Sequence, residues 1–236
     1  WENVPVVDWL QERLKLPVYI DNDVRVNLYG EWYCGAGKGR NNVVLLTLGT
    51  GLGSGIVMDG RVLYGATSSA GEVGHMNMVR TGGRPCKCGS SGCLGRYVSA
   101  LGLLRTLKEK LAGGTPCVIR DWVGGDLEKI TAKMVSDAYD TGDCVAVETM
   151  TETGELLGYG LVNVVNLFNP EIIIIGGGMA AAGDRLLQPA RQVVESHALK
   201  LSREQCSVVT AQLGDSAGML GAAIYAKQRL ERGTRL

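Results

Sequence analysis

Apolar residues change from helical to strand-like spacing and back along the chain, which predicts an α/β protein. The segment 4–16 has apolar residues at roughly helical spacing, and a short β-rich run, 18–20, follows it. Three β-type runs come next: 43–48, 56–58 and 62–64. Asp59-Gly60, before the last of them, is a strong hairpin signal. The first part of the chain is therefore expected to form a helix, a strand and then a meander.

The second part of the chain is dominated by helical spacing. The predicted helices are 100–111, 127–140, 151–168, 181–199 and 215–232. The helix 151–168 has a broad apolar face and should be well buried, and Asn169-Pro170 is expected to end it. The run EIIIIGGG reads as a fully buried strand that leads into glycines.

Composition narrows the classes of partner. The 236 residues include 24 Lys plus Arg and 24 Asp plus Glu, so charge favours neither nucleic acid nor an acidic membrane surface. No apolar run approaches the roughly 20 residues of a membrane span, and no signal-peptide pattern opens the sequence. Seven cysteines, an odd number, in a chain too large to need disulfide staples favour free thiols in a reducing compartment. We therefore expect a cytoplasmic protein with a small-molecule or protein partner.

Four metal-ligand side chains lie close together in the stretch HMNMVRTGGRPCKCGSSGC. They are His75, Cys86, Cys88 and Cys93. One imidazole and three thiolates are a standard set for four-coordinate structural zinc, and the intervening glycines allow a tight loop. The pattern predicts a Zn²⁺ site, with a flexible loop of incidental thiols or a disulfide as the alternative.

Two glycine clusters are candidates for binding phosphate. The run LGTGLGSG lies between two predicted strands, and its N–H groups and the hydroxyls of Thr50 and Ser54 can surround a phosphate. A purely structural turn is the alternative. The second cluster, Gly176-Gly177-Gly178, lies between a buried strand and a helix, where α/β proteins bind anionic ligands. Two such loops suggest a nucleotide.

Two carboxylates, Asp21 and Asp23, flank Asn22 directly after a predicted strand. A carboxylate there can act as general base towards a hydroxyl that a neighbouring amide holds. Asp21 or Asp23 can equally cap the following helix. Arg25 can pair with Asp21 or Glu31, or face solvent.

The spacing of Glu72 and His75 suggests that the predicted zinc site is coupled to a binding site for a small molecule. If one ring nitrogen of His75 binds zinc, the other is left for a hydrogen bond, and Glu72 offers a carboxylate three residues away. A merely solvated Glu72 is the alternative. The second histidine, His197, lies on a predicted amphipathic helix and is expected to be structural or exposed.

Taken in order, these segments resemble the ROK family of repressors, open reading frames and kinases. They are NDVRVNLYGE, GTGLGSG, AGEVGHM, CKCGSSGCL and NLFNPEIIIIGGG, and the likeness runs from about residue 1 to about residue 230. The resemblance implies an actin-like ATPase, hexokinase-type (ribonuclease H-like) fold, mainly the larger lobe with a zinc-binding loop. It also implies a glucokinase-like enzyme that phosphorylates a hexose with ATP and Mg²⁺, commonly as a homodimer.

The same resemblance implies a role for each candidate residue. Asp23 would be the catalytic base that takes a proton from a sugar hydroxyl, the one on C6. The other implied residues are Asn22, Glu72 and His75 for the sugar; Gly49, Thr50, Gly51, Gly177 and Gly178 for ATP; and His75, Cys86, Cys88 and Cys93 for structural zinc. The zinc would then brace the loop that binds the sugar.

The resemblance further divides the chain into three segments. Residues 1–22 would be the end of the smaller lobe and the hinge, 23–214 the larger lobe with the sugar, zinc and nucleotide sites, and 215–236 a helix that packs on the smaller lobe. Family members carry an Asp-x-Gly-Gly-Thr phosphate loop well before the Asn-Asp pair, and these residues contain none. We therefore expect most of the smaller lobe to be absent and this chain alone to be weakly active or inactive.

One position departs from the family pattern. The family's second sugar-contacting glutamate follows Gly-Cys-Leu, where this sequence has Gly95. Loss of that acceptor is expected to cost about 1–3 kcal/mol of sugar binding. Two other functions remain open: a sugar-responsive transcriptional regulator, for which alone a nucleic-acid partner is expected, and a sugar-binding protein without catalysis.

Overall fold

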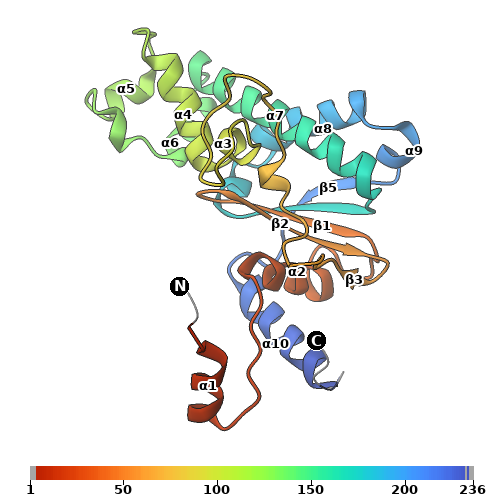
Figure 1. Cartoon of the computed structure of the whole chain (residues 1–236). Coiled ribbons are helices and arrows are strands. Elements are labelled where there is room, and N and C mark those ends of the chain that lie inside the picture. Colours follow the sequence, from red (N-terminus) through yellow and green to blue (C-terminus); the bar gives the residue numbers. More distant parts are fainter. Residues whose placement is uncertain (1–3, 232, 234–236) are drawn as a thin grey trace.

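Five strands form one mixed sheet, in the order β3-β2-β1-β4-β5, in the computed structural model, which describes residues 4–231 and 233 (Figure 1). They are β1 (Val43–Leu48), β2 (Leu52–Met58), β3 (Arg61–Val62), β4 (Ile172–Gly176) and β5 (Ser207–Thr210). Tight turns make β1, β2 and β3 antiparallel neighbours, whereas β4 and β5 run parallel to β1. Asp59 and Gly60 form the second turn at positive φ (49° and 69°), so the predicted meander is confirmed.

Alternate side chains of the central strands enter two separate hydrophobic cores. On β1, Val44 and Leu46 belong to the larger core, whereas Val43 and Leu45 belong to the smaller one. The isoleucines of β4 divide in the same way. Because successive side chains of a strand point to opposite faces, an unbroken apolar run requires cover on both faces.

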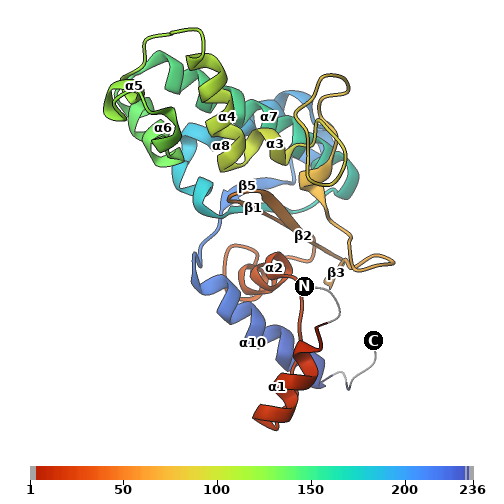
Figure 2. The same cartoon turned by 60° about the vertical axis from the view of Figure 1, so that its left-hand side comes forward.

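Helices supply that cover in two unequal layers, which Figures 1 and 2 both show. The larger-core layer contains α3 (Gly95–Val98), α4 (Ala100–Leu111), α5 (Val118–Trp122), α6 (Ala132–Asp140), α7 (Cys144–Phe168) and α8 (Asp184–His197). The short helix α9 (Lys200–Arg203) follows α8, and three 3-10 turns, η1 (Val73–His75), η2 (Leu127–Lys129) and η3 (Gly178–Ala182), connect elements. On the smaller-core side, α2 (Asp23–Cys34) covers the sheet and α10 (Ser216–Glu231) packs against α2. No helix in the described part of the chain is both long and apolar enough to cross a membrane.

Most predicted helices are present, with shifted ends. α4 has the predicted bounds, and α7 ends at Phe168 with Asn169 in the left-handed conformation (φ 44°). α7 begins before its predicted start at 151, because the Asp143 side chain accepts the Ala146 N–H and caps it. The predicted helix 127–140 is divided into η2 and α6, since Thr131 caps α6 through the Met134 N–H. Arg232, at the end of the predicted helix 215–232, lies outside the described residues.

The predicted strand 18–20 is wrong. These residues pair with no strand among those described, and Ile20 is 65% exposed. A β-branched run forms a strand only where a partner is available, and here it leads from α1 (Val6–Leu14), a predicted helix with no buried residue, to α2. The sequence pattern also missed β5, α5 and α9.

α2 and α10 cross at the distance of backbone contact. A Cβ on Gly30 would lie 2.2 Å from the Ala217 carbonyl oxygen, and one on Gly221 would lie 1.7 Å from that of Val26. Glycine at both positions therefore permits the crossing. The predicted segments 1–22, 23–214 and 215–236 stay a prediction; residues 1–3, 232 and 234–236 lie outside the described part.

Candidate functional site

Asn22 caps α2 and leaves Asp23 as the first residue of the helix. The Asn22 Oδ1 accepts hydrogen bonds from the N–H groups of Val24 (3.0 Å) and Arg25 (3.2 Å). The cap is therefore Asn22, and the alternative that Asp21 or Asp23 caps this helix is wrong. Asn22 and Asp23 are both exposed, so their remaining polar atoms are accessible to a ligand.

One cavity of about 590 Å³ has Asp23 and the second glycine cluster in its walls. Its lining residues are Asp23, Val24, Asn27, Glu31, Leu45, Thr47, Gly176, Gly177, Gly178, Ala211, Gly214, Asp215, Ala217 and Gly218. These come from α2, β1, the carboxyl end of β4 and the turn after it, the segment between β5 and α10, and the start of α10. The N-terminal N–H groups and dipole of a helix favour a negatively charged ligand. The structure thus brings Asp23, Gly177 and Gly178 together around one space.

The first glycine turn adjoins this cavity. β1 and β4 are parallel neighbours with Thr47 opposite Gly176, so the turns that follow them lie at the same edge of the sheet. A Cβ on Gly177 would lie 2.5 Å from the Leu48 carbonyl oxygen, directly before Gly49. Gly49, Thr50 and Gly51 do not line the cavity itself.

The phosphate loop is shorter than the glycine pattern predicts. Residues 52–55 belong to β2, and only 49–51 form the turn. The Ser54 hydroxyl donates to the Gly71 carbonyl and accepts from the Val73 N–H (3.1 Å). The expectation that Ser54 contacts a phosphate is therefore wrong, because its hydroxyl holds the segment that carries Glu72.

A buried polar network joins that segment to α2. The Asp21 carboxylate, 2% exposed, accepts from Arg25 Nε (2.6 Å) and from the Tyr64 hydroxyl (2.7 Å). Arg25 Nη1 also donates to the Ser68 carbonyl (2.8 Å). Burial, with help from the hydrogen bonds to Tyr29 and Asp21, raises the pKa of Tyr64, so its hydroxyl keeps its proton and donates. The predicted pairing of Arg25 with Asp21 is confirmed, whereas the role of Tyr64 was missed.

Glu72 and His75 lie at the two ends of η1. Glu72 Oε2 is 4.0 Å from His75 Nε2, and the side chains are 61% and 46% exposed. No hydrogen bond or ion pair among the described residues joins this pair to Asn22 or Asp23, and the Asp21 network reaches only Tyr64 and Ser68, earlier in the same segment. Gly95 lies beside the same turn, since a Cβ there would be 3.3 Å from the Gly74 carbonyl oxygen.

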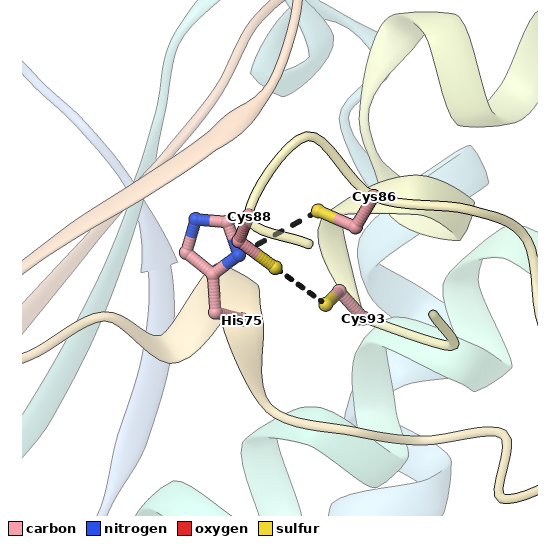
Figure 3. Close-up of side chains that lie close together, drawn as sticks. All are labelled: His75, Cys86, Cys88 and Cys93. Carbon is pink, nitrogen blue, oxygen red and sulfur yellow. Dashed lines mark hydrogen bonds between the residues drawn. The ribbon is translucent and has the colours of Figure 1, made fainter. Parts of the chain in front are cut away.

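The four predicted metal ligands converge (Figure 3). Their ligand atoms all lie within 4.8 Å of one another. Cys86 Sγ is 3.7 Å from His75 Nδ1, and Cys88 Sγ is 3.7 Å from Cys93 Sγ. Two sulfurs bound to tetrahedral zinc at about 2.3 Å lie about 3.7 Å apart, so the donors fit such an ion. Nδ1 of His75 faces the sulfurs, and Nε2 is the nitrogen near Glu72.

Two thiols of this cluster have pKa values shifted in opposite directions. A hydrogen bond from the Cys88 backbone, supported by the neighbouring ligand side chains, lowers the pKa of Cys86 to about 7. Burial, with the neighbouring thiols, raises the pKa of Cys93 to about 12. Near neutral pH one thiolate is thus available, and the buried thiol requires a positive charge nearby to lose its proton.

The base of the cysteine loop is held independently of any metal. The buried Arg84 guanidinium donates to the carbonyls of Arg96 (3.0 Å) and Gly102 (3.1 Å), and to Glu109 (2.6 Å). Sequence reasoning missed Arg84. His197 stacks edge-on against Tyr159 and bonds the Val193 carbonyl, in agreement with the structural role expected of it.

Comparison with known proteins identifies the family. The ROK family model matches residues 1–229. The glucokinase of Halalkalibacterium halodurans is 40% identical over 97% of this chain and 69% of its own length. The crystal structure of a ROK family glucokinase from Streptomyces griseus, in complex with glucose and AMPPNP, superposes with a TM-score of 0.85 at 36% identity over 97% of this chain and 74% of that one.

A regulator of the same family is also similar. The crystal structure of a ROK family transcriptional regulator, a homolog of the E. coli MLC protein, gives a TM-score of 0.83 at 31% identity over 94% of this chain and 55% of that one. These matches confirm the predicted actin-like ATPase type of α/β fold. The chain belongs to the ROK family.

Proposed function

We propose that this chain carries the sugar and nucleotide sites of an ATP-dependent hexose kinase of the glucokinase type. The observation that carries the proposal is the cavity that Asp23 shares with Gly177 and Gly178. A carboxylate beside a strand-end glycine turn and a helix N-terminus suits a hydroxyl acceptor next to a nucleotide phosphate. The likeness to glucokinases supports this assignment.

Asp23 is the proposed general base. Its carboxylate takes the proton of a sugar hydroxyl, that on C6, while the oxygen attacks the γ-phosphorus of Mg-ATP in line with the leaving group. Because such transition states are loose, positioning and charge stabilisation contribute more than proton removal. Asn22, whose Oδ1 is occupied by the cap, presents its NH₂ to the sugar.

The nucleotide is proposed to bind across the two glycine turns. The N–H groups of Thr50 and Gly51 are the proposed phosphate donors, Gly49 shapes the turn because its own N–H donates to the Gly51 carbonyl (2.9 Å), and Gly177 and Gly178 are proposed to lie near adenosine. Support comes from the pairing of β1 with β4, which places both turns at one edge of the sheet. Mg²⁺ enters with ATP as part of the substrate complex.

Glu72 and His75, at the two ends of η1, are the further residues proposed to contact the sugar. His75 is suited to two tasks, since Nδ1 faces the cysteine sulfurs and Nε2 points towards Glu72. The donor set and its spacing fit structural zinc, held by His75, Cys86, Cys88 and Cys93. Bound zinc would neutralise the thiolates and fix the loop. Glu72 and His75 Nε2 hold the sugar hydroxyls by hydrogen bonds.

The decisive test is transfer itself, measured with protein in excess over ATP so that a single turnover suffices. Glucose, fructose, mannose and N-acetylhexosamines are each incubated with Mg-ATP, and the product is analysed by phosphorus NMR. We expect a hexose 6-phosphate. If sugar and Mg-AMPPNP both bind but no hexose is phosphorylated, catalysis is excluded and sugar binding alone remains.

The zinc site has its own test. Mass spectrometry of reduced protein should find about one zinc per chain, and Cys93→Ser should lose it. Cys206→Ser is the matched control, because that thiol is also shielded from solvent but lies outside the cluster. Fewer than about 0.5 zinc per chain, with no effect of chelation, would contradict the site.

A sugar-responsive regulator is the second candidate function. Gly95 in place of the family glutamate and the likeness to a ROK transcriptional regulator favour it. Sugar binding without any detectable transfer to any hexose in the assay above would support this reading.

A further inference from the structure

Glu31 is a buried carboxylate that forms no ion pair with any of the described residues. Its side chain is 1% exposed, near the end of α2. Oε1 accepts from the N–H groups of Gln212 (3.0 Å) and Leu213 (2.8 Å), and Oε2 accepts from Ala36 (3.0 Å) and also from Gln212 (3.2 Å). Three backbone N–H groups therefore compensate one buried negative charge. A carboxylate can accept several hydrogen bonds at once through its two oxygens, which few other side chains can do.

Two of the three residues that Glu31 binds lie next to residues that line the cavity. Gln212 and Leu213 lie between β5 and α10, and their neighbours Ala211, Gly214 and Asp215 line the same cavity as Asp23. The Ala211 N–H donates to the Ile175 carbonyl (2.9 Å), one residue before the second glycine cluster. The segment 211–215 is thus fixed to the end of β4 on one side and to α2, through Glu31, on the other.

The surrounding backbone is arranged to admit this carboxylate. A Cβ on Gly35 would lie 2.2 Å from Glu31 Oε2, so any larger residue would displace the carboxylate. Next to Glu31, Gly30 allows α10 to approach α2 at backbone contact. Asp23 and Glu31 are separated by eight residues of one helix, a rigid span of about 12 Å.

We propose that Glu31 is a positioning residue that sets the nucleotide-side wall of the cavity at a fixed distance from Asp23. Glu31 itself lines this cavity, but both of its carboxylate oxygens are engaged by backbone N–H groups, so its proposed action on the nucleotide is through those groups. It binds the N–H groups of Gln212 and Leu213, and so places the first turn of α10 and the segment 211–215 for the nucleotide. This inference rests on the proposed function, because it assigns a nucleotide to this cavity.

Glu31→Gln is the informative change, because it keeps the shape of the side chain. It replaces one acceptor oxygen by an NH₂ group that faces backbone donors, so at least one N–H loses its partner. The segment 211–215 should then move away from α2, and the nucleotide should lose its fit while the sugar loop is unaffected.

Glu171→Gln is the matched control. Glu171 Oε2 accepts the N–H groups of Asn41 (2.7 Å) and Asn42 (2.8 Å) at the opposite end of the sheet, away from the cavity. Partial burial raises the pKa of Glu171, but the hydrogen bonds from the N–H groups of Asn42 and Asn41 outweigh this effect and hold the pKa below its usual value. Both changes therefore remove one charge from a carboxylate that binds backbone N–H groups.

The experiment is calorimetric titration of the whole chain with Mg-AMPPNP and, separately, with glucose. For Glu31→Gln we expect at least a tenfold loss of AMPPNP affinity and a change in glucose affinity of less than twofold. Glu171→Gln, which alters a more exposed carboxylate that also lies 3.7 Å from Arg40, should lower the melting temperature less and change neither affinity by more than twofold. Equal AMPPNP affinity of Glu31→Gln and the parent chain would overturn the inference.

A second variant covers a failure of Glu31→Gln to fold. Glu31→Asp keeps the charge but shortens the side chain by one methylene, and it should show the same selective loss of AMPPNP affinity. If neither variant folds, Glu31 is a purely structural residue and the inference is wrong. If the parent chain itself does not bind AMPPNP, the proposed function fails instead, so the two failures are distinguishable.

Discussion

The two faces of the sheet differ in how they are covered and in what they carry. The face under α3 to α8 packs on a large hydrophobic core, whereas the smaller core on the other face contains, among the described residues, only Leu28, Val43, Leu45, Val57, Ile172 and Ile174. Yet Asp21, Asp23 and Glu31 are all on or next to α2, on the less covered face. The layer of α2 and α10, the thin layer, therefore holds Asp23 and Glu31, whereas the larger-core side supplies most of the apolar packing and also carries Glu72, His75 and the cysteine cluster.

In the thin layer, close backbone contacts and hydrogen bonds hold α2 to its neighbours, and apolar packing contributes less. Glycines bring α2 against α10, and the Asp21 and Glu31 carboxylates join α2 to the loops on either side of it. Such contacts depend on direction and distance more than apolar packing does. Small changes in this layer are thus expected to alter binding before they unfold the chain.

The largest expected effect is on catalysis. Asp23→Asn removes the proposed base but keeps the oxygen that accepts the Val24 N–H (2.9 Å), so the fold should be retained. The rate of phosphoryl transfer should fall about 10²–10⁴-fold, as is typical of the loss of a general base. Single-turnover kinetics measure the rate, and calorimetry should find the affinity for AMPPNP within about threefold of that of the parent chain, a change of about 0.7 kcal/mol or less.

Asp184→Asn is the control for this change. Asp184 is likewise the first residue of a helix, α8, but lies outside the cavity. It should leave the rate unchanged. If Asp23→Asn transfers the phosphoryl group at the parent rate, Asp23 is not the general base. The difference in function between the two faces of the sheet would then lose its main support.

The second effect separates stability from binding. Leu157→Ala in the larger core and Leu28→Ala in the smaller one each truncate a side chain that is 0% exposed, so each should cost about 2–5 kcal/mol of unfolding free energy. Urea denaturation measures that loss. Only Leu28→Ala should also weaken AMPPNP binding, because Leu28 lies on α2. Equal losses of AMPPNP affinity in both variants would contradict the division of roles between the faces.

Sequence patterns predicted the long elements better than the short ones, on both faces of the sheet. The apolar runs of β1 and β4 and the long face of α7 depend on local spacing, which the sequence displays directly. The strand 18–20 failed because strand formation requires a partner, which local spacing does not reveal. β5 was missed since only Val208 of its four residues is buried.

The candidate site was predictable only where its residues lie near one another in sequence. The four candidate metal ligands occupy one short stretch of sequence, and the structure brings them together as predicted. Glu31 binds residues 181 and 182 positions away, so no motif shows its role. Tyr64 and Asp21 are likewise separated by 43 residues. Long-range polar contacts of this kind carry no periodic signal.

The third effect concerns the helix crossing in the thin layer. Gly221→Ala places a Cβ 1.7 Å from the Val26 carbonyl oxygen, so α10 must move away from α2. We expect a loss of about 1–3 kcal/mol of unfolding free energy. Gly218→Ala on the same helix is the control, because its Cβ would meet only Asn27 Oδ1 at 3.5 Å, and it should stabilise the helix by up to about 1 kcal/mol. If urea denaturation gives the two variants the same free energy of unfolding, the crossing of α2 and α10 is not tight.

The smallest expected effect is a gain, at the edge of the larger-core layer. Gly95→Glu restores the family carboxylate beside the Glu72–His75 turn, and its Cβ would meet the Gly74 carbonyl oxygen and Leu52 Cβ at 3.3 Å, a tight contact. One added charged hydrogen bond, reduced by that crowding, should strengthen glucose binding about tenfold, or about 1.4 kcal/mol. Calorimetry compares it with Gly95→Gln, which has the same length without the charge and should gain less. A loss of glucose affinity in both variants, with AMPPNP binding unchanged, would mean that glycine at this position is required by the packing of α3 and that the sugar site of this chain differs from the family pattern.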